Sequence, residues 1–145
     1  NTANNFYITG IQLEIGDTVT DFEHRKFSEE LRACQRYFCR TYPYGTATGN
    51  ANSSSSQASS VYGTITYADA GTWRFPVEMR AAPTVVAYST QNANTSGKIT
   101  ADATDGNASV AFAGRTSVFL VRSNDSSGVA ANAFLKAHAT ADAEL

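Results

Sequence analysis

This sequence has few of the features that assign a function quickly. Its 145 residues include only 2 cysteines and 3 prolines, and the formal net charge is −2. Cys34 and Cys39 are poorly placed for a disulfide and too few for a zinc site, so we expect two reduced thiols. Without a basic field, nucleic-acid binding lacks its usual electrostatic source. No apolar run approaches the roughly 20 residues of a membrane span, so no membrane insertion is expected.

The composition is that of a folded protein. Hydrophobic residues make up 42% of the chain and charged residues 17%, which is too apolar for a disordered segment. The length favours one compact domain with an attached segment. Because the chain begins at Asn1 and enters strand-like sequence at once, we expect a fragment of a longer protein whose missing part lies upstream. We divide it into a leader with its junction, residues 1–25, and a helix plus β-body, residues 26–145.

The leader is predicted to contain an extended strand over residues 6–15. Apolar side chains lie on one face up to Ile8 and on the other face from Ile11, with Gly10 at the switch. A strand that is apolar on both faces needs cover on both sides. The chain's own body or an upstream module could supply this cover, but we favour identical copies of the chain. The predicted interface residues are Ile11, Leu13 and Ile15.

A short amphipathic helix is predicted next. Ser28 offers a capping hydroxyl at its start, and Leu31 and Cys34 share a helical face. The aromatic-rich sequence that follows predicts a strand from about Arg36, which Pro43 and Gly45 end.

The remainder of the chain predicts an all-β body. Residues 46–60 are small and polar and indicate a long mobile loop. Short runs with apolar alternation and turn-forming connectors then predict an antiparallel β-sandwich. The expected strands are 61–67, 73–80, 84–88, 108–113, 117–123 and 133–140; the expected turn is 69–71, and the expected connectors are 91–97, 101–107 and 124–132.

Several sequence blocks resemble the C-terminal region of bacteriophage tail-fibre and related virion proteins. The first is FYITGIQLEIGD at residues 6–17, followed by FEHR at 22–25 and the helix over 29–38. FPVEMRAAPT at 75–84 and ADAEL at 141–145 complete the set. Two departures are Asp21, where many relatives have a proline before the phenylalanine, and the second cysteine near the helix.

The resemblance implies that the first block closes an upstream jelly-roll or carbohydrate-binding-like fibre domain. It implies that the rest is a terminal domain, a homotrimer at the distal end of the tail fibre on the virion. Host attachment would then occur through a bacterial surface glycan, either polysaccharide or lipopolysaccharide. A purely structural trimerisation or connector module, and a polysaccharide depolymerase, are the alternatives.

Catalysis and cofactor binding find little support in the sequence. Glycoside hydrolysis needs two facing carboxylates, whereas the body's aspartates fall mainly in expected turns and Glu78 alone is expected squarely on a strand. His24 and His138 lie far apart, and no Gly-x-Ser-x-Gly motif is present. Residues 102–107 carry oxygen ligands but lack calcium-loop spacing, which favours an ordinary Asx turn. We therefore expect no enzyme, no metal and no cofactor.

Sugar recognition requires exposed rings and polar side chains that bond to hydroxyl groups. Trp73 alternates in phase with Phe75 and is therefore assigned to the core rather than to a sugar platform. Each candidate contact residue can equally be a turn former. The predicted receptor-binding residues are Tyr42, Tyr44, Tyr62, Arg74, Asn92, Asn94, Asn124 and Asp125.

Overall fold

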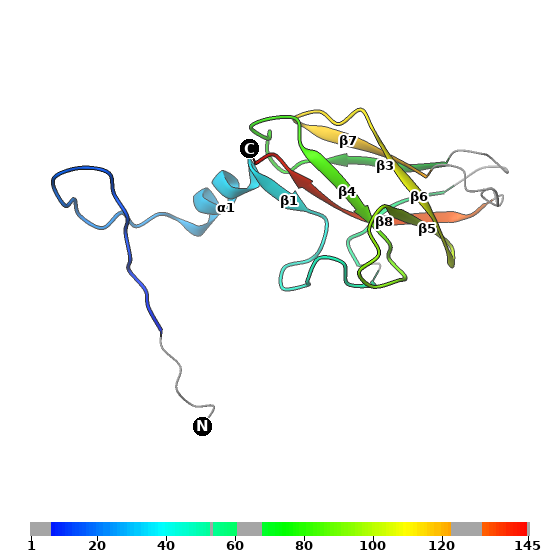
Figure 1. Ribbon diagram of the computed structural model, residues 1–145, viewed down its shortest axis with the longest axis horizontal. Helices are drawn as coiled ribbons and strands as arrows, with labels where there is room; N and C mark the ends of the chain where they lie inside the picture. Colours follow the sequence, from blue (N-terminus) through cyan, green and yellow to red (C-terminus); the bar gives the residue numbers. More distant parts are fainter. Residues whose placement is uncertain (1–6, 53, 61–67, 123–131, 145) are drawn as a thin grey trace, which may run out of the picture.

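The computed structural model describes residues 7–52, 54–60, 68–122 and 132–144. Within these ranges the chain is mostly β with one short helix, as the all-β prediction expects, and the strands form an antiparallel curled sheet (Figure 1). None of the helical structure described is long and apolar enough to cross a membrane. The elements are α1 (Phe27–Gln35), β1 (Phe38–Arg40), β2 (Gln57–Ser60), β3 (Ala68–Arg74), β4 (Thr84–Tyr88), β5 (Lys98–Ala101), β6 (Thr104–Ala111), β7 (Ser117–Arg122) and β8 (Phe134–Asp142).

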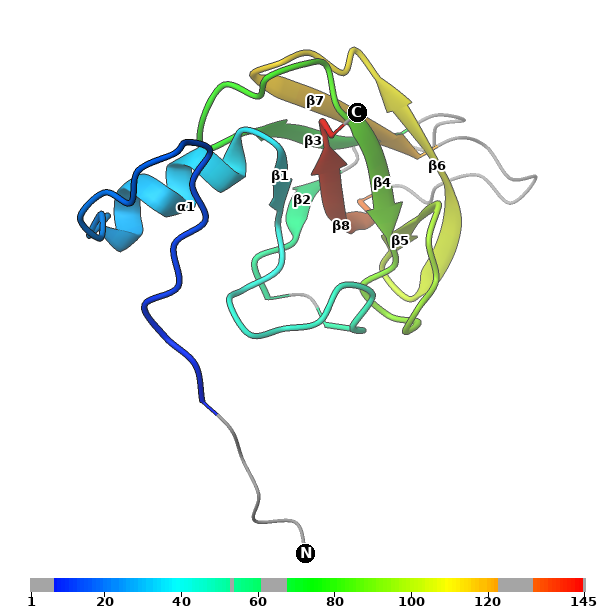
Figure 2. The ribbon, with the colours of Figure 1, turned by 60° about the vertical axis from the view of Figure 1, so that its left-hand side comes forward.

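The last strand, β8, organises the sheet because four strands pair with it. Its first half pairs with β2 and β5, and its second half pairs with β1 and β4. From β5 the order continues through β6 and β7 to β3. The sheet then curls until β3 lies beside β2 (Figure 2), where the Ser59 hydroxyl donates a hydrogen bond to the Asp69 carbonyl.

The core lies inside this curl. Alternate residues of β8 face inward and are buried, namely Leu135, Ala137, Ala139 and Ala141, together with Ala133 just before the strand and Ala143 just beyond it. Alanine has a low strand propensity, so pairing on both edges and burial, rather than local preference, hold this segment extended. The small side chains leave room for larger residues from elsewhere in the chain, among them Trp73, Met79, Ile99, Val118 and Leu120. The assignment of Trp73 to the core is confirmed.

Several predicted strand and loop positions are wrong. Residues 46–60 are not all loop, because 57–60 form β2 against β8. Residues 101–107 are not a connector, because β5 and β6 form a hairpin around Asp102 and Ala103. Asp102 has a φ of 49°, a conformation that aspartate tolerates better than most residues, and its carboxylate accepts the Phe134 N–H at 2.9 Å.

The third error concerns β3. Residues 69–71 are not a turn but part of the strand, with a bulge between Asp69 and Gly71; the φ of Gly71 is 98°, which favours glycine. The strand ends at Arg74 instead of continuing to residue 80. Pro76 lacks an N–H and cannot donate to a neighbouring strand. Beyond β3 the backbone instead bonds to the turn before β7, where the Met79 N–H donates to the Arg115 carbonyl at 2.8 Å. Glu78 is therefore not on a strand.

The predicted leader strand is also not formed in the described part of the leader, residues 7–25, which contains no helix or strand. In Figure 1 this segment extends away from the body, on the far side of α1. The predicted interface residues are almost fully accessible in the single chain: 73% for Ile11, 98% for Leu13 and 107% for Ile15. A lone strand has no neighbour to satisfy its backbone, which explains why the alternation alone does not produce a strand.

The helix starts two residues earlier than predicted. Lys26 occupies the N-cap position without a side-chain hydrogen bond, so Ser28 lies inside the first turn and does not cap it. None of the helix residues is buried, although Leu31 is partly covered. Figure 2 shows α1 beside the sheet rather than over it. Its apolar residues therefore contribute little to the core of the single chain.

Candidate functional site

The outer face of the β1, β8 and β4 region carries a candidate surface site. In the first row of this face, Asp142 of β8 lies between Phe38 of β1 and Thr84 of β4. The next row is Arg40, Thr140 and Val86, and Tyr88 lies beside His138 in the third. These residues alternate with the inward-facing alanines of β8 and so lie on the side of the sheet away from the core.

A groove of about 600 Å³ lies on this face. We call it the outer groove. Its apolar lining residues are Phe38, Val86 and Tyr88, two of them aromatic. Its polar lining residues are Thr48, Thr84, Thr140, Asp142 and Glu144. Aromatic surface combined with a few hydrogen-bonding groups is typical of sites that bind small polar molecules. Phe38 is 42% exposed, so its ring is available to a ligand.

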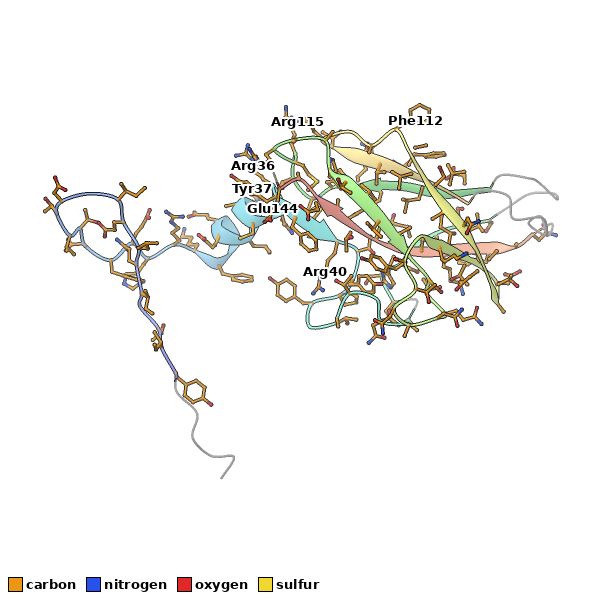
Figure 3. All side chains as sticks on the ribbon, in the orientation of Figure 1. Arg36, Tyr37, Arg40, Phe112, Arg115 and Glu144 are labelled. Atoms are coloured by element: carbon orange, nitrogen blue, oxygen red, sulfur yellow. The ribbon has the colours of Figure 1, made fainter. Side chains whose placement is uncertain are left out.

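The two carboxylates come from the end of β8 and the residues after it. Asp142 Oδ1 accepts the Glu144 backbone N–H at 2.9 Å, which fixes the path of the chain beyond the strand. The Ala143 N–H donates to the Tyr37 carbonyl at 2.7 Å and ties this end to β1. In Figure 3, Glu144 lies at the end of the body where α1 meets it, and Arg40 lies on the lower side of β1.

A buried aromatic pair supports one end of the outer groove. The Tyr42 ring stacks on His138 with centroids 3.9 Å apart and planes 16° apart. Tyr42 also meets Tyr88 edge-on at 6.2 Å, and its hydroxyl accepts the Gly49 N–H at 3.0 Å. Tyr42 therefore joins β8, β4 and the loop after β1, and it positions Tyr88 in the groove wall.

His138 is fully buried and both of its ring nitrogens have partners. Nε2 lies 3.2 Å from Asn52 Oδ1 and Nδ1 lies 2.9 Å from Thr41 Oγ1. Because Asn52 Oδ1 can only accept, Nε2 carries the hydrogen and Nδ1 accepts from the Thr41 hydroxyl. Burial lowers the pKa of His138 below its usual value of 6.5. The ring is therefore neutral and structural, and it is not available as a catalytic base or a ligand.

The prediction that Tyr42 is an exposed receptor contact is wrong. Only 5% of the residue is exposed, and burial raises the pKa of its hydroxyl. Alternation suggested exposure because the strand's outer face is normally solvated. Here residues 43–52 fold over that face, and the sequence of β1 does not contain this information.

The other predicted contact residues lie in several places. Tyr44 is 80% exposed and lines, with Tyr42 and Leu31, a cleft of about 340 Å³ between α1 and the body. Arg74 is exposed, as expected, at the end of β3. Tyr62, Asn124 and Asp125 lie outside the described residues.

Asn92 and Asn94 are exposed but hold their own loop together. Asn92 Nδ2 donates to Asp105 Oδ2 at 2.7 Å. The Asn94 N–H donates to the Gly49 carbonyl at 2.7 Å, with Asn94 at a φ of 58°. These contacts match the alternative interpretation of both residues as turn formers.

Asp105 lies on β6, not in a turn, and anchors the 89–97 loop. Its Oδ1 accepts hydrogen bonds from Ser89 and Thr100 at 2.8 and 2.7 Å. Burial raises its pKa, but the hydrogen bonds from Asn92, Thr100 and Ser89, with the nearby charge of Lys98, outweigh this, so the net pKa is lowered. The carboxylate is a structural acceptor rather than a proton donor.

No group of three or more potential metal-ligating side chains occurs within the described ranges.

Both cysteines are free thiols, as predicted, with Cys34 exposed and Cys39 buried. Glu78, the one body carboxylate predicted squarely on a strand, does not lie on one. The Glu78 side chain forms an ion pair with Arg115 at 3.0 Å. Two other carboxylates, Asp142 and Glu144, share the outer groove.

Sequence reasoning missed the outer groove. Val86 and Tyr88 alternate with buried Ala87, which is a readable sign of one exposed face on β4. Their position next to Phe38 and Asp142 depends on which strands flank β8. No local sequence pattern predicts that strand order. Comparisons of the chain with protein-family models, with curated proteins and with solved structures give no significant match.

Proposed function

We propose that this chain forms the receptor-binding tip of a bacteriophage tail fibre and attaches the virion to a host surface glycan without catalysis. The outer groove is the observation that carries this proposal, because its aromatic rings and hydrogen-bonding groups suit a saccharide. The sequence blocks that resemble tail-fibre C-terminal regions supply the virion context. In this proposal the curled sheet is the β-sandwich tip of a homotrimer.

Trimerisation would serve both stability and binding. Copies of the leader would cover one another's exposed apolar side chains, including Ile11, Leu13 and Ile15. Three copies would also present three outer grooves on one particle. Several weak sites on a rigid body raise the apparent affinity for a repeating surface polymer. Polysaccharide and lipopolysaccharide both provide such repeats.

A binding assay on arrayed glycans and whole bacterial cells tests the proposal. Phe38→Ser removes an exposed ring of the groove and should weaken binding about tenfold, at the upper end of what aromatic contacts contribute. Phe112→Ser is the matched control, since Phe112 is 89% exposed and Figure 3 places it at the β6–β7 end, away from Glu144.

Equal loss in the two variants would show that the groove is not the binding site. An assembled protein that binds no glycan and no cell would favour the alternative role of structural connector.

One observation favours a polysaccharide depolymerase as second candidate. Asp142 and Glu144 line the same groove, and glycosidases use a pair of carboxylates. Incubation with bacterial polysaccharide and measurement of new reducing ends tests this activity. Product that disappears in Asp142→Asn or Glu144→Gln would establish the enzyme, whereas binding without product would leave the adhesin.

A further inference from the structure

We propose that the cleft between α1 and the body, which we call the α1 cleft, receives the leader of a second copy of this chain. This inference rests on the homotrimer of the proposed function, in which the leader would then contact the body of a neighbouring copy as well as the neighbouring leaders. It depends on where apolar side chains are exposed. Among the described residues, every exposed large hydrophobic side chain other than Val110, Phe112 and Phe134 belongs to residues 7–44.

Helix α1 has an apolar stripe that its own chain leaves uncovered. Phe27, Leu31 and Cys34 follow one another at helical spacing, yet none of the nine helix residues is buried. A helix of this length is marginal in water and depends on the packing of its apolar face. Leu31 and Cys34 line the α1 cleft, so this cleft is where the helix lacks cover.

The body side of the α1 cleft is also largely apolar. Its lining includes Tyr42, Tyr44 and Pro76, and the Phe27 ring meets Tyr44 edge-on at 6.4 Å, which links the helix to the body. A space of about 340 Å³ remains between the two walls. Aliphatic side chains that enter this space leave water, which favours association.

The leader of the same chain does not occupy this space. None of its residues lines the α1 cleft, and Figure 1 shows the leader on the far side of α1. The Gln12 side-chain oxygen accepts the Glu23 N–H at 2.7 Å, and the Glu14 carboxylate accepts the Thr20 N–H at 3.2 Å. The leader therefore folds back on itself as an arm. An arm and a cleft that lie apart in one chain can meet between two copies, as in domain swapping.

The charges of the two surfaces are complementary. Residues 7–23 contain acidic residues, among them Glu14 and Asp17, and no lysine or arginine. Residues 31–60 contain arginines and no acidic residue, and Arg40 lines the α1 cleft. Opposite charges on two surfaces favour their association and fix its orientation. This complementarity, together with the shared apolar character, identifies the occupant as the leader of another copy.

Disulfide trapping tests the contact on the full chain in a Cys34→Ser background, which removes the exposed native thiol. One chain carries Leu13→Cys, and a co-expressed chain with a longer tag carries Tyr44→Cys. Both positions are exposed in the single chain, and thermal unfolding checks that each variant is folded. After air oxidation, non-reducing electrophoresis reports the linked species. Phe112→Cys replaces Tyr44→Cys in the matched control, because Phe112 is exposed at the β6–β7 end.

The expected main product is a disulfide between the Leu13→Cys chain and the Tyr44→Cys chain, with little linkage in the control. Tyr44→Glu, which places a negative charge opposite the acidic arm, should lower the oligomer mass in light scattering, whereas Phe112→Glu should not. Linkage no greater than in the control would overturn the proposal. So would a disulfide that closes within one chain carrying both substitutions.

Glycan and cell binding, measured separately on the unsubstituted chain, keeps this inference distinct from the proposed function. Binding without the mixed disulfide would overturn the contact between leader and cleft and leave the adhesin. The mixed disulfide without binding would uphold the contact and remove the adhesin.

Discussion

The ring of Tyr42 lies flat on the imidazole of His138, with 3.9 Å between centroids. This contact joins β8 to the segment that follows β1, residues that are far apart in the sequence. Beside it, Thr41 Oγ1 accepts the Ala139 N–H at 3.0 Å and the Thr41 N–H donates to the Ala139 carbonyl at 3.0 Å. The outer groove therefore rests on a rigid, buried layer rather than on a loose loop.

Removal of the Tyr42 ring should destabilise the protein strongly. We expect Tyr42→Ala to lower the free energy of unfolding by about 3–5 kcal/mol, the usual range for loss of a buried ring. Tyr42→Phe keeps the stack and loses the hydroxyl that accepts the Gly49 N–H, so it should cost about 1 kcal/mol. Denaturant unfolding measures both. Tyr44→Ala is the control and should change stability by less than about 0.5 kcal/mol; equal effects at the two positions would contradict the structure.

Stability should fall as pH drops below the ordinary histidine range. The pKa of His138 is lowered in the folded state by burial. The unfolded chain therefore takes up a proton at higher pH than the folded chain does. The His138 contribution is complete above the unfolded pKa of about 6.5 and is lost as pH falls toward the lower folded value.

Thermal unfolding measured from about pH 7.5 to 5 tests this linkage, with His138→Gln as the comparison. The variant should be less stable than the wild type at neutral pH, and its melting temperature should fall less steeply as the pH is lowered. His24 is exposed and is present in both proteins, so it is common to the two measurements. Parallel pH profiles for the wild type and the variant would show that His138 does not cause the decline.

The two thiols should differ sharply in reactivity. Cys34 is exposed on α1, whereas Cys39 is 5% exposed and burial raises its pKa to about 11. Because the thiolate is the reactive form, iodoacetamide at about pH 8 should modify Cys34 first and leave Cys39 intact. Mass spectrometry of the tryptic peptides reports both sites. Denaturant should make both react, and equal rates in the native protein would disagree with the burial of Cys39.

The leader should control assembly without controlling the fold of the body. A triple variant with Ile11→Ser, Leu13→Ser and Ile15→Ser should lower the oligomer mass measured by light scattering. The unfolding of the body should change little, because none of these residues belongs to the core. Val19→Ser, at a leader residue that is 92% exposed and outside the predicted interface, serves as the control. An unchanged mass in the triple variant would show that this segment does not hold copies together.

Strand predictions succeeded where a short apolar alternation was bounded by turn residues. Residues 84–88 and 117–122 are strands nearly as expected. Strand predictions failed where the local signals were weak or misleading. The segment Gln57–Ser60 is small and polar, yet it forms β2 because it pairs with the edge of β8. The candidate site residues were predicted less well. Tyr42 is covered by a loop that is held by the hydrogen bond of Gly49 with Asn94 and by that of Asn52 with His138.

By itself, the sequence determined the β-rich class, the short helix, the burial of Trp73 and the apolar character of the leader. These properties follow from composition and from periodicity over a few residues, and such local patterns survive in any arrangement of the strands. The tertiary structure alone decided that β8 has strands on both sides and that Phe38, Tyr88 and Asp142 share one groove. Strand order and register arise from pairings between distant segments, which compete through total burial and hydrogen bonding rather than through local preference.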